Sequence, residues 1–175
     1  MIIRGTTVVL GGARSGKSSF AEHLARRSGL PRLYIATATA GDEEMQQRIT
    51  RHRAERGPEW RTIEEPLALL DVLSRETSDG VTLVDCLTLW LSNMMEAQSD
   101  VALESRRLAD WLRGREHRII LVSNEVGMGL VPDTPLGRKF RDAQGRLNQV
   151  VAAAVNNVAF VAAGLPIWLK GGSPD

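Results

Sequence analysis

Residues 11–18 have the sequence Gly-Gly-Ala-Arg-Ser-Gly-Lys-Ser and follow the apolar run Thr7-Val8-Val9-Leu10. They fit the pattern G-x-x-x-x-G-K-[ST], and residues 19–25 have the composition of a helix. Where a strand is followed by a glycine loop and then a helix, successive backbone N–H groups of the loop point at a bound polyphosphate. The positive end of the helix adds to this attraction. The stretch therefore predicts a phosphate-binding loop. The alternative is a glycine-rich turn that binds nothing, and the flanking strand and helix argue against it.

Each residue type in this loop has a chemical reason. Gly11 and Gly16 allow backbone conformations that a side chain would block. Lys17 can reach the β- and γ-phosphates of a nucleotide, and the Ser18 hydroxyl is a potential ligand for Mg²⁺. The residues expected to bind a nucleoside triphosphate are Gly11, Gly12, Ala13, Arg14, Ser15, Gly16, Lys17 and Ser18.

The composition is that of a globular protein without a strong charge. The chain has 175 residues and a net charge of +1, so no global field favours nucleic acid or an anionic membrane. The single cysteine, Cys86, excludes an intramolecular disulfide and agrees with a reducing cytoplasm. No apolar run approaches the ~20 residues that span a bilayer. We expect one cytoplasmic domain over residues 1–175, with neither a membrane span nor a nucleic-acid partner.

Apolar runs alternate with helical patterns along the chain, which predicts an α/β fold with a mostly parallel sheet. The expected strands cover residues 6–10, 32–36, 61–63, 82–84, 118–123, 158–162 and 167–169. The expected helices cover residues 18–28, 43–56, 66–74, 87–96, 101–113 and 136–156. Pro66 is placed in the first turn of its helix, where proline is tolerated.

Several expected strands end in residues that carry chemistry. In an open parallel sheet, ligands bind beyond the carboxyl ends of the strands. Four of these ends lead into the phosphate loop, Thr37-Ala38-Thr39, Asp85, and Asn124-Glu125. Their convergence on one edge is a stronger argument for a site than any one of them alone.

Asp85 follows the buried run Val81–Val84 and precedes an expected helix. An acidic residue at such a strand end commonly holds Mg²⁺, directly or through water, beside the serine or threonine of the phosphate loop. Ser18 and Asp85 are therefore the candidate metal ligands. The alternative role for Asp85 is to cap the following helix.

His52 lies in a strongly basic segment, with four arginines between residues 48 and 56. The simplest interpretation of such a charge run is a solvated helix face. Guanidinium groups also bind phosphate oxygens in bidentate fashion, and they disfavour a protonated imidazole. Because a neutral imidazole is a nucleophile, His52 is a candidate for covalent chemistry on a phosphate.

A flexible apolar loop follows the strand that ends at Ser123. Its first residues are polar and its glycines allow adaptation, so it can line a pocket for a large, partly apolar acceptor. The candidate substrate-loop residues are Asn124, Glu125, Gly127 and Gly129. An ordinary connection between strand and helix is the equal alternative.

Taken together, these motifs resemble one family over residues 9–161. They are the phosphate loop, Tyr34-Ile35-Ala36-Thr37-Ala38, Asp42-Glu43-Glu44-Met45 with Arg48-Ile49 and His52, Trp60-Arg61-Thr62 with Glu64, Asp85-Cys86-Leu87-Thr88, Ser123-Asn124-Glu125-Val126-Gly127-Met128-Gly129, Phe140-Arg141-Asp142, Gly145-Arg146 and Asn148-Gln149. The family is the bifunctional adenosylcobinamide kinase / adenosylcobinamide-phosphate guanylyltransferase of cobalamin biosynthesis. The His52 segment joined to the Asn124–Gly129 segment makes this resemblance specific.

The resemblance implies a RecA-like P-loop NTPase that carries out two steps on a corrinoid. ATP or GTP first phosphorylates the aminopropanol hydroxyl of adenosylcobinamide. GMP then passes from GTP to that phosphate through a GMP–histidine intermediate at His52, and pyrophosphate is released. Lys17 serves catalysis, Mg²⁺ is the cofactor, and the assembly is a homotrimer.

The resemblance also places further nucleotide contacts on this sequence. They are Thr37, Ala38, Thr39, Ala54, Glu55, Arg56, Gly57, Glu64 and Asp85. Two alternatives without covalent nucleotide remain at this point. One is a simple small-molecule kinase with a phosphate loop, and the other is a regulatory ATPase that acts on partner proteins.

Overall fold

Seven strands form one sheet in the computed structural model, which describes residues 5–39, 57–76 and 79–172. Their order across the sheet is β3-β2-β4-β5-β1-β6-β7. The strands are β1 (Thr6–Gly11), β2 (Arg32–Ala36), β3 (Trp60–Glu64), β4 (Val81–Asp85), β5 (Arg118–Asn124), β6 (Asn157–Ala162) and β7 (Leu165–Lys170). All neighbours are parallel except β6 and β7, which form an antiparallel hairpin. The predicted mostly parallel sheet is confirmed.

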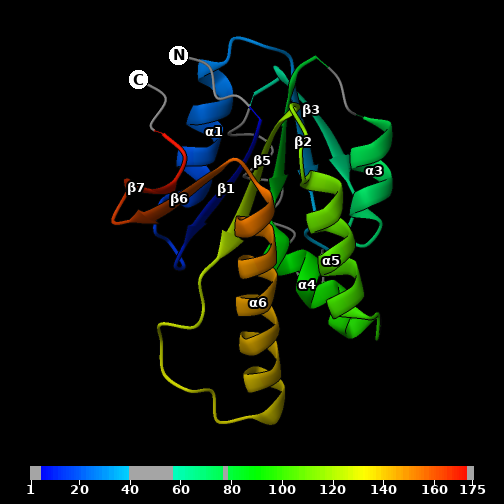
Figure 1. Ribbon diagram of the computed structural model, residues 1–175, viewed down its shortest axis with the longest axis vertical. Helices are drawn as coiled ribbons and strands as arrows, with labels where there is room; N and C mark the ends of the chain where they lie inside the picture. The colour runs from blue at the N-terminus through cyan, green and yellow to red at the C-terminus, as the bar shows by residue number, and fades with distance from the viewer. Residues whose placement is uncertain (1–4, 40–56, 77–78, 173–175) are drawn as a thin grey trace.

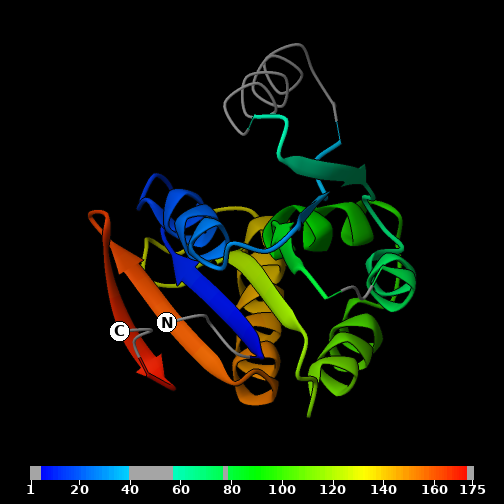
Figure 2. The same ribbon diagram turned by 90° about the horizontal axis from the view of Figure 1, so that it is seen from above.

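Helices cover both faces of this sheet (Figures 1 and 2). The described helices are α1 (Lys17–Arg27), α3 (Leu69–Arg75), α4 (Leu87–Glu96), α5 (Val101–Leu112) and α6 (Pro135–Ala154). Helix α1 packs on one face, and α3 to α6 pack on the other. Among the described residues, no helix combines the length and the apolar character needed to cross a membrane.

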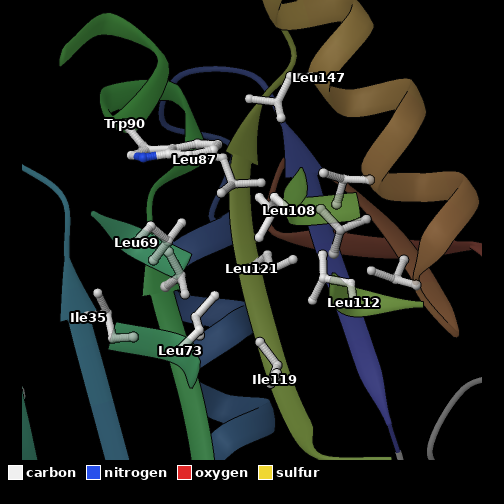
Figure 3. Packing of buried hydrophobic residues seen from close by; sticks show 14 of the residues in the cluster. Ile35, Leu69, Leu73, Leu87, Trp90, Leu108, Leu112, Ile119, Leu121 and Leu147 are labelled. Carbon is white, nitrogen blue, oxygen red and sulfur yellow. The ribbon is translucent and has the colours of Figure 1, made fainter. Parts of the chain in front are cut away.

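Successive side chains of the central strands point alternately into two apolar clusters. Leu121 of β5 lies in the cluster beneath α3 to α6, whereas Val122 lies in the cluster beneath α1. Figure 3 shows the first cluster, to which Leu121 of β5 and Leu108 and Leu147 of the helices belong. A strand buried on both faces takes apolar residues at most of its positions, which explains the nearly continuous apolar runs in the sequence.

Most predicted elements are confirmed within one or two residues, but the helix predicted over residues 66–74 starts too early. Helix α3 begins at Leu69, so Pro66 precedes it rather than lying in its first turn. The Glu65 carboxylate accepts hydrogen bonds from the backbone N–H groups of Leu67 and Ala68, at 3.0 and 2.8 Å. This local side-chain turn competes with helical backbone bonding and delays the helix. The helix predicted over residues 43–56 lies outside the described residues. Strands β3 and β7 are both longer than predicted.

Candidate nucleotide-binding site

The strand order brings three chemically important strand ends side by side. Asp85 ends β4 and Asn124 ends β5, and β5 lies between β4 and the strand β1 that leads into the phosphate loop. Gly11 pairs with Asn124, while Asp85 pairs with Val122, two residues earlier on β5. Val122 in turn pairs with Val9, so Asp85 lies about two residues, ~7 Å, short of the level of Gly11. The convergence expected from the sequence is present at this edge.

The phosphate loop has the tight conformation that its glycines predict. Arg14 and Gly16 both have positive φ, at 56° and 92°. Helix α1 begins directly after Gly16, whose carbonyl accepts from the N–H of Phe20 at 2.9 Å. A side chain at position 16 would place its Cβ 3.1 Å from the Cα of Gly164. The N–H of Gly164 also donates to the Ser15 carbonyl at 2.8 Å, so the β6–β7 turn supports the loop from behind.

The Lys17 side chain folds over the loop to which it belongs. Its ammonium group donates to the carbonyl oxygen of Gly12 at 3.4 Å. This contact keeps a positive charge inside the arc of the loop, where phosphate oxygens bind in proteins with this motif. Gly12 and Ala13 complete the loop, and Ser18 lies in the first turn of α1.

Asp85 is held by a tyrosine from the neighbouring strand. The hydroxyl of Tyr34 donates to Oδ2 of Asp85 at 2.8 Å, and Tyr34 itself is buried edge-on against Trp60. The peptide bond between Asp85 and Cys86 is cis. Helix α4 is capped by Cys86 without a side-chain hydrogen bond, so the alternative role of Asp85 as a helix cap is not observed. The carboxylate instead lies fixed at the strand end.

Thr37 joins the ends of β2 and β4. Its buried hydroxyl donates to the Cys86 carbonyl at 2.7 Å and accepts from the Cys86 N–H at 2.9 Å. Its own carbonyl accepts from the side-chain amide of Asn93 at 2.7 Å. The hydroxyl of Thr37 is therefore engaged within the protein, whereas Ala38 and Thr39 continue toward the surface.

The start of the loop after β5 is fixed, and its middle is exposed. The N–H of Glu125 donates to the Gly11 carbonyl at 3.0 Å. The Glu125 carboxylate accepts from the N–H groups of Gly127 and Met128, at 2.6 and 3.1 Å, so it shapes its own loop. A Cβ at Gly127 would approach this carboxylate to 2.9 Å, whereas one at Gly129 would meet no atom within 4 Å. A steric reason for glycine therefore exists at position 127 but not at position 129.

The described structure does not bring the remaining predicted site residues together with the phosphate loop. Glu64 ends the edge strand β3, four strand positions or about 19 Å across the sheet from β1. Gly57 has a φ of 83° and adjoins the segment that is not described. His52, Ala54, Glu55 and Arg56 fall outside the described residues, so the structure does not place them.

Four polar side chains that support this edge had no role assigned to them from the sequence: Tyr34, Thr88, Gln144 and Asn148. Tyr34, Thr88 and Asn148 belong to the motifs that carry the family resemblance, whereas Gln144 belongs to none of them. Gln144 and Asn148 interrupt the apolar stripe that Leu147 and Val151 form on α6. A buried side-chain amide needs a hydrogen-bond partner, so an amide within the apolar stripe of a helix indicates a polar contact with another element. This was the signal in the sequence that could have identified Gln144 and Asn148. Those partners lie on β5, more than 20 residues earlier in the chain.

The thiol of Cys86, beside this edge of the sheet, is unreactive. Burial, and then the negative charge of Asp85, raise the pKa of the Cys86 thiol to about 11. Lys17 acts in the opposite direction with a smaller effect. Near neutral pH the thiol is protonated, so Cys86 is not a nucleophile in this site.

Comparison with known proteins identifies close relatives. Residues 7–169 match the family model described as "Cobinamide kinase / cobinamide phosphate guanyltransferase". The chain is 52% identical to the bifunctional adenosylcobalamin biosynthesis protein CobP of Pseudomonas aeruginosa, over 94% of this chain and 96% of the relative. It is 36% identical to the corresponding protein CobU of Escherichia coli, over 93% of this chain and 98% of the relative. These matches confirm the resemblance seen in the motifs.

Solved structures with low sequence identity share the fold. The P4 protein of bacteriophage phi6 in complex with ADP aligns with a TM-score of 0.52 and 16% identity, over 95% of this chain and 55% of that one. The RadB recombinase aligns with a TM-score of 0.50 and 15% identity, over 89% and 73%. The expected RecA-like P-loop architecture is confirmed at the level of fold.

Proposed function

Because this chain belongs to the cobinamide kinase / cobinamide phosphate guanyltransferase family, we propose that it phosphorylates adenosylcobinamide and then transfers GMP to the product. The observation that carries the proposal is a complete phosphate loop within a family match over residues 7–169. The simple kinase and the regulatory ATPase have no support in the relatives. ATP or GTP is the phosphoryl donor of the first step, and GTP is the nucleotidyl donor of the second.

In the first step the aminopropanol hydroxyl attacks the γ-phosphorus and the nucleoside diphosphate leaves. Such a transfer depends mainly on positioning and on neutralising charge. The loop from Gly11 to Ser18 holds the phosphates with its backbone N–H groups, and the Lys17 ammonium neutralises their charge. The contact of Lys17 with the Gly12 carbonyl supports this role, because it keeps the ammonium over the loop.

In the second step His52 attacks the α-phosphorus of GTP and pyrophosphate leaves. The phosphate of adenosylcobinamide phosphate then attacks the same phosphorus and releases the histidine, giving adenosylcobinamide-GDP. Splitting the transfer into two displacements is the advantage of a covalent intermediate. The arginines on either side of His52 in the sequence supply cations for the α-phosphate oxygens. Ala54, Glu55, Arg56, Gly57 and Glu64 are proposed as further nucleotide contacts.

Mg²⁺ fits the donor set at the strand ends. This cation usually keeps several waters and takes one or two protein oxygens together with substrate phosphates. Ser18 and Asp85 provide one hydroxyl and one carboxylate, and Tyr34 holds the carboxylate in place. When bound, the ion neutralises charge on the phosphates.

The loop after β5 is proposed to contact the corrinoid. Met128 and Leu130 are 80% and 95% exposed, and Val131 is also exposed. The same loop starts at the Gly11 carbonyl, beside the phosphate site, and leads away from the sheet before α6 (Figure 1). A large acceptor with apolar surface matches both properties.

Assembly as a homotrimer and a cytoplasmic location complete the proposal. Sedimentation analysis tests the oligomeric state.

Labelling with GTP that carries ³²P at the α-phosphate tests the proposed function. The chain has three histidines, and His23 and His117 are exposed. We expect covalent label in wild type and in both His23→Ala and His117→Ala, and none in His52→Ala. Peptide mass analysis identifies the labelled residue. Wild-type labelling of His52→Ala would remove the covalent step from the proposal. Lys17→Ala is expected to lose both activities.

A further inference from the structure

The last residue of β5, Asn124, is fixed by three neighbouring elements. Its backbone N–H donates to Oγ1 of Thr88 on α4 at 2.8 Å. Its carbonyl accepts from the side-chain amide of Asn148 on α6 at 2.9 Å. The next N–H, of Glu125, donates to the Gly11 carbonyl of β1 at 3.0 Å. The backbone of Asn124 is therefore locked against the phosphate loop.

A buried cluster of three polar side chains lies behind this residue. We call Ser123, Gln144 and Asn148 the amide cluster. The Ser123 hydroxyl donates to Oδ1 of Asn148 at 2.7 Å, and Nε2 of Gln144 lies 2.9 Å from Ser123 Oγ and 3.0 Å from Asn148 Oδ1. Ser123 and Gln144 are completely buried. Hydrogen bonds in such surroundings are strong and restrict movement, so the cluster is a rigid support for Asn124.

The side chain of Asn124 points to the face of the sheet that carries the nucleotide site. Leu121 and Ser123 face α6, whereas Val122 faces α1. Alternation along the strand places Asn124 on the α1 side, together with the phosphate loop. Its Oδ1 is buried and has no hydrogen-bond partner among the described residues. A buried amide oxygen without a partner is costly, so a role with a ligand explains it.

We propose that Asn124 is a catalytic residue of the kinase step and that Gln144 and Asn148 are positioning residues for it. A side-chain amide both accepts and donates. Its oxygen accepts a hydrogen bond from the attacking hydroxyl, and its N–H donates to an oxygen of the transferring phosphoryl group. The hydroxyl oxygen bonds to the γ-phosphorus, the bond to the β–γ bridging oxygen breaks, and the hydroxyl proton passes to a phosphoryl oxygen and then to water. The proposal rests on the kinase step proposed above.

Two substitutions of Asn124 separate this role from a structural one. Asn124→Asp keeps an acceptor but loses the donor, and Asn124→Ala loses both. We expect a roughly 10–100-fold lower kcat for phosphorylation of adenosylcobinamide in both, with a smaller change in the KM for the nucleotide. The ratio of the kinase rate to the rate of covalent labelling by GTP is expected to fall. Equal losses in both reactions, or a wild-type kcat, would overturn the proposal.

Gln144→Leu tests the positioning role without removing the support of the fold. The bond between Ser123 and Asn148 remains, and the substitution also removes Oε1 of Gln144, which is buried without a partner among the described residues. We expect a melting temperature near that of wild type and a kinase kcat lowered severalfold. Gln149→Leu, on the exposed side of the same helix, is the matched control and is expected to keep wild-type rates.

A double-mutant cycle completes the test. If Gln144 acts through Asn124, Gln144→Leu has no further effect on kcat in the Asn124→Ala background. Additive losses would overturn the positioning role. Wild-type protein that binds nucleotide but phosphorylates no adenosylcobinamide would instead refute the proposed function, which keeps the two failures distinguishable.

Discussion

Substitution of Gly16 by alanine tests the geometry of the phosphate loop. Gly16 has a φ of 92°, and an alanine there costs about 1–2 kcal/mol in backbone energy. Its Cβ would lie 3.1 Å from the Cα of Gly164, which is backbone and must move by a few tenths of an ångström. Overpacking of this kind costs about 1–3 kcal/mol more. Gly29→Ala is the matched control, because Gly29 has a φ of 67° and its Cβ would meet no atom within 4 Å.

The assay is thermal melting of both variants without nucleotide, followed by calorimetric titration with GTP and Mg²⁺. Both variants are destabilised by an alanine at positive φ, but only Gly16→Ala also introduces the close contact with the Cα of Gly164. For a domain of this length, 1 kcal/mol corresponds to about 2–4 °C, so Gly16→Ala is expected to melt roughly 2–12 °C below Gly29→Ala. Nucleotide affinity is expected to fall in Gly16→Ala alone. Coincident melting curves, or full affinity for GTP in Gly16→Ala, would refute this account of the loop.

Three further predictions concern the neighbouring strand ends. Tyr34→Phe removes the hydrogen bond to Asp85 and is expected to cost about 1.5–3 kcal/mol by denaturant unfolding; an unchanged midpoint contradicts a fixed carboxylate. Thr37→Val leaves the N–H of Cys86 without its side-chain partner and is expected to lower stability by about 1–3 kcal/mol, whereas the exposed Thr39→Val is expected to change it by less than about 0.5 kcal/mol. Because burial raises the pKa of Cys86 to about 11, iodoacetamide is expected to label native protein slowly at pH 8 and rapidly only near that pKa, while unfolded protein reacts at pH 8; fast native labelling at pH 8 counts against a buried thiol.

The sequence alone determined the class of fold and the phosphate loop. Both depend on interactions between residues close in the chain, or on burial that a run of apolar residues reveals directly. The motif from Gly11 to Ser18 specifies its own turn, and the continuous apolar runs specify strands buried on both faces. The family resemblance suggested the reaction, and the family match over residues 7–169 confirms the family.

The tertiary structure decided which polar side chains complete the site. Strand β5 enters the sheet between β1 and β4, which places Asn124 between the phosphate loop and Asp85 although the two residues are 39 positions apart in the sequence. Tyr34 reaches Asp85 across 51 positions, and the Gln144 amide reaches Ser123 across 21. No local sequence pattern predicts such pairs, because each of these polar side chains has its hydrogen-bond partner far away in the sequence. Only folding brings the two residues together. The sequence therefore predicted the phosphate loop, and the order of the strands decided which side chains surround it.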